Sequence, residues 1–143
     1  MEKLDFEIKL ISNTTGFCPE VRVGIDHINY FAGEVLGEEI IKFTASVADN
    51  FNLNISYAGN NARNLILDDQ GMPTNSVQIT VDNIQIEGID ITQIAYKNSK
   101  FKVDNTEKYI DQYELTECMD LGLHGVWTMH VQSPVYIWML ENL

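Results

Sequence analysis

The chain has 143 residues, of which 45% are hydrophobic, and its formal net charge at pH 7 is −12. This length is typical of one domain and allows a core that needs no disulfide or metal to hold it together. The 21 carboxylates outnumber the 9 lysines and arginines and make a surface that repels phosphate groups. We therefore expect a single globular domain over residues 1–143 that does not bind nucleic acid.

The length of the apolar runs and the spacing of the cysteines show whether the chain is expected to be a membrane protein or a zinc or redox protein. No apolar run approaches the roughly 20 residues that span a bilayer, and the N-terminal residues Met1–Asp5 lack the apolar core of a signal peptide. We therefore expect no membrane segment and no membrane partner. Cys18 and Cys118 match no zinc or redox spacing. We expect two free thiols in a reducing compartment, with a bridge between them across a sandwich as the alternative.

Apolar and polar residues alternate along the first part of the chain, which predicts half-buried strands. The alternation covers four stretches, at Leu4–Leu10, Val21–Ile25, Ile41–Val47 and Phe51–Tyr57. Asp26–Asn29 has turn chemistry and leads into Tyr30 and Phe31, so we expect a hairpin there. Asp49 and Asn50 make a tight connection between the third stretch and the fourth, and we expect these two strands to form the clearest hairpin of the chain.

The middle of the chain changes character twice. Asn60–Ser76 is rich in Asn, Asp and other turn residues, and this composition predicts a loop. Strand character then returns over Val77–Ile91. Its apolar phase shifts after Val81, which predicts a β-bulge near Asp82–Asn83.

The last part of the chain combines a polar stretch with a final strand. Lys97–Cys118 is polar, aromatic and aperiodic, and we interpret it as a long surface excursion. Val126–Val131 is expected to be the last strand. Val135–Leu143 carries apolar residues close to helical spacing, which predicts a short C-terminal helix, with a final strand as the alternative.

About eight or nine short strands joined by polar turns, without a long helix between them, exclude a βαβ architecture. Closed barrels and two-sheet sandwiches remain, and loops of uneven length favour the sandwich. The predicted fold is an all-β, jelly-roll-like β-sandwich with a short C-terminal helix. Four aromatic residues on inward strand phases are expected in its core, namely Phe6, Phe43, Phe51 and Trp127.

No pattern in the sequence predicts catalysis. The histidines His27, His124 and His130 lie in no nucleophile or triad signature. Gly33 and Gly37 lack the Lys-Ser/Thr pair of a phosphate-binding loop. We therefore predict that the protein is not an enzyme.

One turn has the chemistry of a hard-cation site. Asp68 and Asp69, followed by Gln70 and Gly71, place two carboxylates and an amide together, and oxygen ligands of this kind suit calcium. The spacing does not match an EF-hand loop, and an ordinary Asx-type turn is the simpler explanation. Calcium is therefore the metal to consider, with Asp68 and Asp69 as its ligands.

Three tyrosines in or beside the polar stretch favour a binding function. A flat aromatic ring can stack on a sugar ring while neighbouring amides bind the sugar hydroxyls. The candidate ligand-binding residues are Tyr96, Tyr109, Tyr113, Asn98, Asn105 and Gln112. The alternative is a loop that its tyrosines pin to the domain, without a ligand.

Several stretches of the sequence resemble one group of proteins. They are Val81–Asp90 with the Tyr96 and Ser99–Phe101 that follow it, Cys118–Thr128, and Ser133–Leu143. On these stretches the chain resembles small β-sandwich domains of tailed phages of marine bacteria, which are similar to calcium-dependent, xylan-binding carbohydrate-binding modules. The resemblance covers most of the chain, and it lies on residues that determine the fold.

This resemblance implies a non-catalytic, phage-encoded module that binds a glycan, with calcium as a cofactor. The sequence lacks an unmistakable equivalent of the carboxylate set that holds calcium in those modules. A phage origin implies a location on the virus particle or in the host cytoplasm. It also implies a second hypothesis, a structural or assembly protein of the virion that contacts only other virion proteins. Fold resemblance alone does not decide between these functions.

Overall fold

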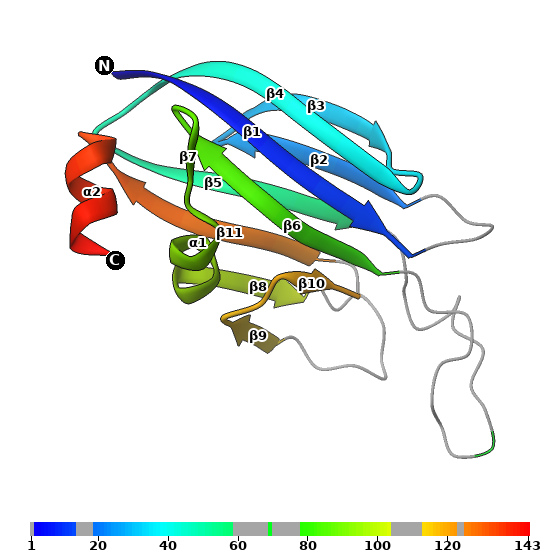
Figure 1. Cartoon of the computed structure of the whole chain (residues 1–143). Coiled ribbons are helices and arrows are strands. Elements are labelled where there is room, and N and C mark those ends of the chain that lie inside the picture. Colours follow the sequence, from blue (N-terminus) through cyan, green and yellow to red (C-terminus); the bar gives the residue numbers. More distant parts are fainter. Residues whose placement is uncertain (1, 14–18, 59–68, 70–77, 104–112, 123–124) are drawn as a thin grey trace.

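Two antiparallel sheets pack face to face in the computed structural model, which describes residues 2–13, 19–58, 69, 78–103, 113–122 and 125–143 (Figure 1). The first, the β1 sheet, consists of β10 (Asp120–Leu121), β6 (Ile79–Ile86), β1 (Glu2–Ser12) and β4 (Glu38–Val47) in this order, and β7 (Ile89–Asp90) also pairs with β6. The second, the β5 sheet, consists of β3 (Ile28–Glu34), β2 (Glu20–Ile25), β5 (Asn50–Ala58), β11 (Gly125–Gln132), β8 (Ser99–Val103) and β9 (Tyr113–Thr116). The predicted all-β sandwich is confirmed.

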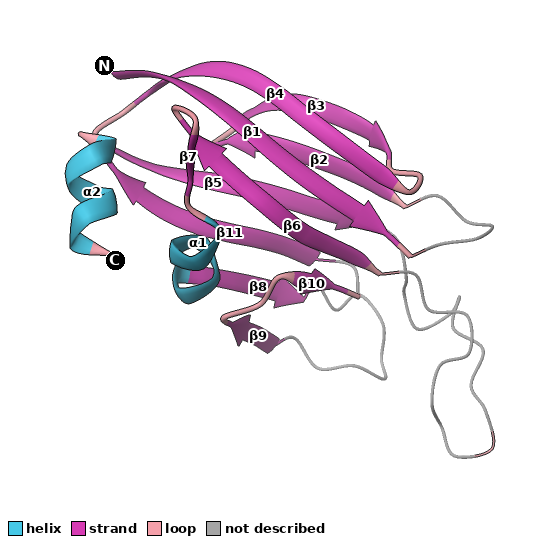
Figure 2. Ribbon diagram, in the orientation of Figure 1, coloured by secondary structure: helices cyan, strands magenta, loops and turns pink. Residues whose placement is uncertain are grey.

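Two short helices complete the described chain, α1 (Thr92–Asn98) and α2 (Val135–Glu141) (Figure 2). The helix α2 confirms the predicted C-terminal helix over the alternative of a final strand. Each helix has seven residues, so neither of these described helices is long enough to cross a membrane.

The core lies between the sheets, where the inward phases of their strands meet. Phe6, Phe51 and Trp127 are buried there as predicted. Phe43 is only half-buried, because β4 is the outermost strand of its sheet. Its ring stacks between Phe6, at a centroid distance of 5.0 Å, and Tyr30 of β3, at 4.7 Å. This stack closes one side of the sandwich, where β3 and β4 are the edge strands.

The predicted bulge is confirmed in β6. Lys9 of β1 pairs with Asn83, whereas the next residue, Leu10, pairs with Val81. Asp82 is therefore the extra residue, and it explains why the apolar phase of the sequence shifts at this point.

The hairpin between β2 and β3 is also confirmed. Asp26 adopts a positive φ of 53° in its turn and accepts a hydrogen bond from the Asn52 backbone N–H at 2.9 Å. Gly24 is required beside this turn, because a Cβ at that position would lie 2.4 Å from the carbonyl oxygen of Ile28. The second predicted hairpin is wrong. Ala48–Asp49 joins β4 to β5, but these strands belong to different sheets, so this tight connection crosses from the β1 sheet to the β5 sheet.

The interpretation of Lys97–Cys118 as one surface excursion is wrong for its described parts. Ser99–Val103 forms β8, which lies inside the β5 sheet between β11 and β9, and buries Phe101 and Val103. The preceding helix α1 was not predicted either. It follows an Asx-type turn in which Asp90 accepts hydrogen bonds from both the backbone N–H and the hydroxyl of Thr92.

Candidate functional site

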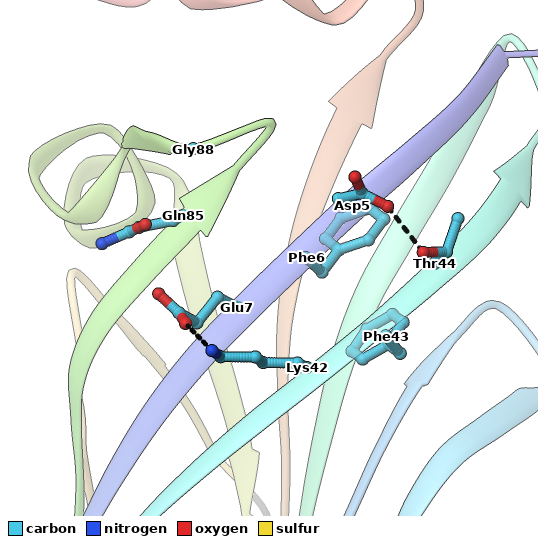
Figure 3. Close-up of a pocket in the computed structure, with 8 residues that line it drawn as sticks. All are labelled: Asp5, Phe6, Glu7, Lys42, Phe43, Thr44, Gln85 and Gly88. Carbon is cyan, nitrogen blue, oxygen red and sulfur yellow. Dashed lines mark hydrogen bonds and ion pairs between the residues drawn. The ribbon is translucent and has the colours of Figure 1, made fainter.

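The outward face of the β1 sheet carries two adjoining hollows, of about 410 and 260 Å³, that share Glu7 and Gln85. Figure 3 shows the larger one, which Asp5, Phe6, Glu7, Lys42, Phe43, Thr44, Gln85 and Gly88 line. The smaller hollow continues along the same face and is lined by Glu7, Lys9, Ile40, Asp82, Asn83 and Gln85. We name the polar surface that these hollows form the sheet groove.

Strand alternation and register place the side chains of the sheet groove. On β1 the residues Leu4, Phe6 and Ile8 point inward, so Asp5, Glu7 and Lys9 point outward. The antiparallel register sets Glu7 opposite Lys42 on β4 and opposite Gln85 on β6. Directly opposite residues have neighbouring side chains on one face, so three strands supply adjacent polar groups.

Cross-strand contacts hold several of these side chains in place. Lys42 Nζ lies 3.2 Å from Glu7 Oε1, and the Thr44 hydroxyl donates a hydrogen bond of 2.5 Å to Asp5 Oδ1. In the smaller hollow, Lys9 Nζ lies 3.5 Å from both Glu38 and Asp82. These ion pairs are solvent-exposed and add little stability. Their consequence is an ordered alternation of hydrogen-bond acceptors and donors across the sheet.

This chemistry suits a neutral ligand with many hydroxyl groups. Carboxylates accept hydrogen bonds, lysine ammonium groups donate them, and the amides of Gln85 and Asn83 do both. Ile40, whose exposed fraction is 51%, adds an apolar patch in the smaller hollow. Phe6 and Phe43 lie under the larger hollow, but Phe6 is buried, so its ring offers no face for stacking. Among the described residues, the sheet groove therefore offers mainly polar groups to a ligand, and the buried ring of Phe6 offers no aromatic platform.

The outward face of the β5 sheet also carries a hollow of about 310 Å³, beside Arg22, Ser56 and Val126. Arg22 is paired there with Glu20 at 3.4 Å. Farther along this face, the His130 ring nitrogens lie 3.1 and 3.3 Å from the side-chain oxygens of Asn52 and Asn50. His130 thus belongs to a row of surface amides, as expected for a residue on the outward phase of its strand.

The sequence-predicted ligand residues are only partly described. Tyr96 lies on α1 with an exposed fraction of 42%, and the Asn98 amide donates a hydrogen bond of 2.8 Å to the Ile94 carbonyl at the end of that helix. Tyr113 begins β9 opposite Val103, at the far end of β8 from α1. A strand of this length separates the two ends by about 13 Å. Three of the predicted residues lie outside the described residues, namely Asn105, Tyr109 and Gln112.

The predicted calcium turn is described at one position. Asp69 is exposed, and Asp68 lies outside the described residues. Within the part of the chain that the structure describes, no three His, Cys, Asp or Glu side chains gather as a metal-binding group. A calcium site at Asp68 and Asp69 stays a prediction.

Cys118 is a free, half-buried thiol next to the core. Its burial raises the pKa of the thiol, so the group is neutral near pH 7 and a poor nucleophile. The Cys118 carbonyl accepts hydrogen bonds from Trp127 Nε1 at 2.7 Å and from the Ser99 hydroxyl at 3.0 Å. These contacts give Cys118 a structural role at the junction of β8, β11 and the chain that leads into β10.

The sheet groove was not predicted from the sequence. The outward phase of Asp5, Glu7 and Lys42 can be inferred from alternation, but no local signal gives the register that brings three strands together. Comparisons of the chain with protein-family models, with curated proteins and with solved structures find no match.

Proposed function

We propose that the protein is a non-catalytic binding module that takes a neutral glycan on the outward face of its β1 sheet. The observation that carries the proposal is the sheet groove, two adjoining hollows that share Glu7 and Gln85. A sugar chain presents hydroxyl groups along both of its edges. A strip of alternating acceptors and donors across three strands matches such a ligand better than one small pocket does.

The charge of the protein narrows the class of glycan. With a net charge of −12, the chain repels uronic acids, sulfated sugars and other anionic polymers. The lysines of the sheet groove are already paired with carboxylates at 3.2 to 3.5 Å, so they do not form a free cationic patch. A neutral hexose or pentose polymer, such as a xylan backbone, is the expected ligand.

The tyrosine-containing segment is the second part of the proposal. We propose that it adds aromatic stacking that the sheet groove lacks, with Tyr96, Tyr109 and Tyr113 as the candidate stacking residues and Asn98, Asn105 and Gln112 as the candidate hydrogen-bonding residues. Stacking on an aromatic ring adds affinity that hydrogen bonds exposed to water do not provide. Calcium bound at Asp68 and Asp69 is the proposed cofactor of this part, because the resemblance to calcium-dependent modules implies it.

A glycan array probed with the full chain, with and without a chelator, tests the proposal. We expect binding to neutral polysaccharides, and a chelator is expected to reduce it if calcium takes part. A hit is then titrated while backbone amide shifts are followed by NMR. Shifts that cluster on β1, β4 and β6 support the sheet groove. Absence of binding to every neutral glycan refutes the proposed function.

Matched variants separate the two parts of the proposed site. Glu7→Gln and Lys42→Met each remove one charge from the sheet groove, and each is expected to weaken binding about tenfold through the loss of a charge-assisted hydrogen bond. Glu114→Gln and Lys102→Met are the controls, since this opposite-charge pair lies directly across strands on the β5 sheet. Tyr109→Ala with Tyr113→Ala tests stacking. Full affinity in this double variant assigns binding to the sheet groove alone.

A virion structural or assembly protein is the second candidate function. It is favoured by the apolar surface of the C-terminal segment, where the exposed fractions of Tyr136, Ile137, Leu140 and Leu143 are 50%, 52%, 70% and 85%. Exposed apolar residues that cluster in this way are typical of protein contacts. A negative glycan array combined with loss of particle incorporation in Leu140→Ser would favour this function over glycan binding.

A further inference from the structure

The edge of β4 is unusually open to another strand. Within the part of the chain that the structure describes, β4 has a neighbour on one side only, β1. Its register with β1 runs without interruption from Glu38 to Val47, and the strand contains no proline. Long, regular edges of this kind expose a row of backbone N–H and C=O groups that can pair with a further strand.

The other described edges are protected against such pairing. β7 and β10 have two residues each, and β9 has four. The edge strand β3 carries a bulge, because Val23 pairs with Phe31 while the next residue, Gly24, pairs with Asn29. Tyr30 is therefore an extra residue that disrupts the regular row of backbone groups on β3. Among the described edges, β4 alone combines length with regularity.

We propose that two copies of this chain pair antiparallel through their β4 edges and join their β1 sheets into one. Antiparallel pairing of identical strands has a two-fold axis at one residue, so that directly opposite side chains lie on the same face. The outward side chains of β4 include Glu38, Ile40 and Lys42, with exposed fractions of 54% for the side chain of Glu38, 51% for Ile40 and 73% for the side chain of Lys42. The order acid, apolar, base is what selects the register.

An axis at Ile40 pairs residues 38–42 of one copy with residues 42–38 of the other and makes Glu38, Ile40 and Lys42 complementary. Ile40 then packs on Ile40 of the second copy, Glu38 lies opposite Lys42, and Lys42 lies opposite Glu38. A shift of the axis to Lys42 sets two lysines against each other, and a shift to Glu38 sets two glutamates together. Both of these axes are unfavourable because directly opposite like charges destabilise a sheet, and an axis at any other residue of β4 does not set Glu38 opposite Lys42.

The same register extends charge pairs that already exist within each copy. Asp82, Lys9 and Glu38 form a chain of contacts in which Lys9 lies 3.5 Å from each acid. Lys42 lies 3.2 Å from Glu7. Across the joint, Glu38 of one copy meets Lys42 of the other, and the signs alternate from one sheet into the next. The pairing also covers part of the exposed side chain of Ile40. This inference does not depend on glycan binding.

A charge-reversal experiment tests the pairing by sedimentation velocity at physiological ionic strength over a concentration series. The wild-type chain is expected to show a reversible dimer. Glu38→Lys opposes two lysines at each joint and Lys42→Glu opposes two glutamates, so each variant alone is expected to lose at least about tenfold in dimer affinity. An equimolar mixture of the two variants restores both opposite-charge pairs. It is expected to form a heterodimer, which native mass spectrometry identifies.

Ile40→Lys places two lysines at the axis and is expected to abolish the dimer. Ile28→Lys is its control, because it makes the same change at an exposed position of β3, and it is expected to dimerise like the wild type. Circular dichroism establishes that each variant is folded. A wild-type chain that stays monomeric at its highest attainable concentration overturns the proposal. A dimer that persists in Ile40→Lys, or a mixture that remains monomeric, overturns it as well.

Discussion

Replacement of Glu2 by alanine is expected to weaken the attachment of α2 to the sandwich. Glu2 Oε1 accepts a hydrogen bond of 2.6 Å from the Ser133 hydroxyl and one of 3.1 Å from the Val135 backbone N–H. A single carboxylate thus joins the first strand to the first turn of the last helix, across 133 positions of sequence. The helix has no side-chain cap of its own, and Glu2 satisfies one of the backbone N–H groups at its N-terminus, that of Val135.

The expected loss of unfolding free energy follows from these two hydrogen bonds. Hydrogen bonds to a charged acceptor contribute about 1.5–3 kcal/mol each when buried, and Glu2 is half-buried, so water compensates part of the loss. We expect Glu2→Ala to lower the free energy of unfolding by about 2 kcal/mol, which corresponds to a fall in Tm of about 4–8 °C for a chain of this size. Glu2→Gln keeps an acceptor oxygen and is expected to lose about half as much.

Urea unfolding followed by tryptophan fluorescence measures the effect, because Trp138 lies on α2 and is 5% exposed. Glu7→Ala is the matched control on the same strand. Its ion pair with Lys42 is exposed, so its removal is expected to cost less than about 1 kcal/mol. If Glu2→Ala is no more destabilising than Glu7→Ala, the role assigned to Glu2 is refuted.

Two further substitutions probe the turns. Gly24→Ala places a Cβ 2.4 Å from the Ile28 carbonyl oxygen, so we expect it to lower the free energy of unfolding by about 1–3 kcal/mol, measured by urea denaturation. An unchanged urea midpoint would show that the β2–β3 hairpin accommodates the Cβ without strain. Asp90→Ala removes the acceptor of the turn before α1 and is expected to cost about 1 kcal/mol at neutral pH. Hydrogen bonds from Thr92 hold the pKa of Asp90 below its ordinary value of 3.8. The stability that Asp90 contributes is therefore fully present above pH 3.8 and is lost as the pH falls through the lower pKa of the folded state. The stability difference between wild type and Asp90→Ala should therefore shrink in acid, and a constant difference down to that range would contradict the assignment.

The strands with strict alternation of apolar and polar residues could be predicted, because one face of each strand is buried and the other faces solvent. The bulge at Asp82 was predictable for the same reason, since an extra residue is the simplest way to move a strand from one phase to the other. The strand β8 escaped prediction because it has five residues and follows directly on a helix. Phe101 and Val103 do alternate with Lys100 and Lys102, but the alternation covers only five residues and lies between polar residues, so it does not indicate a strand.

The helix α1 escaped for a related reason. A helix of seven residues makes fewer than two full turns, so its buried residues Ile94 and Ala95 show no periodicity. Its start depends on a side-chain contact of Asp90 that resembles any other turn in sequence. The sheet groove lay beyond sequence reasoning altogether, because Asp5, Thr44 and Gln85 meet only through the register of three strands.

The glycan and pairing proposals meet on β4. Lys42 lines the larger hollow of the sheet groove and also faces the open edge, while Ile40 lines the smaller hollow and lies at the proposed axis. Pairing through β4 places the outward faces of two β1 sheets on one side, so two sheet grooves would lie next to each other. Two sites on one rigid body bind a polymer with a higher effective concentration than either site alone. Water-exposed polar contacts bind weakly on their own, so pairing through the open edge of β4 would raise the apparent affinity of this module for a polymer ligand.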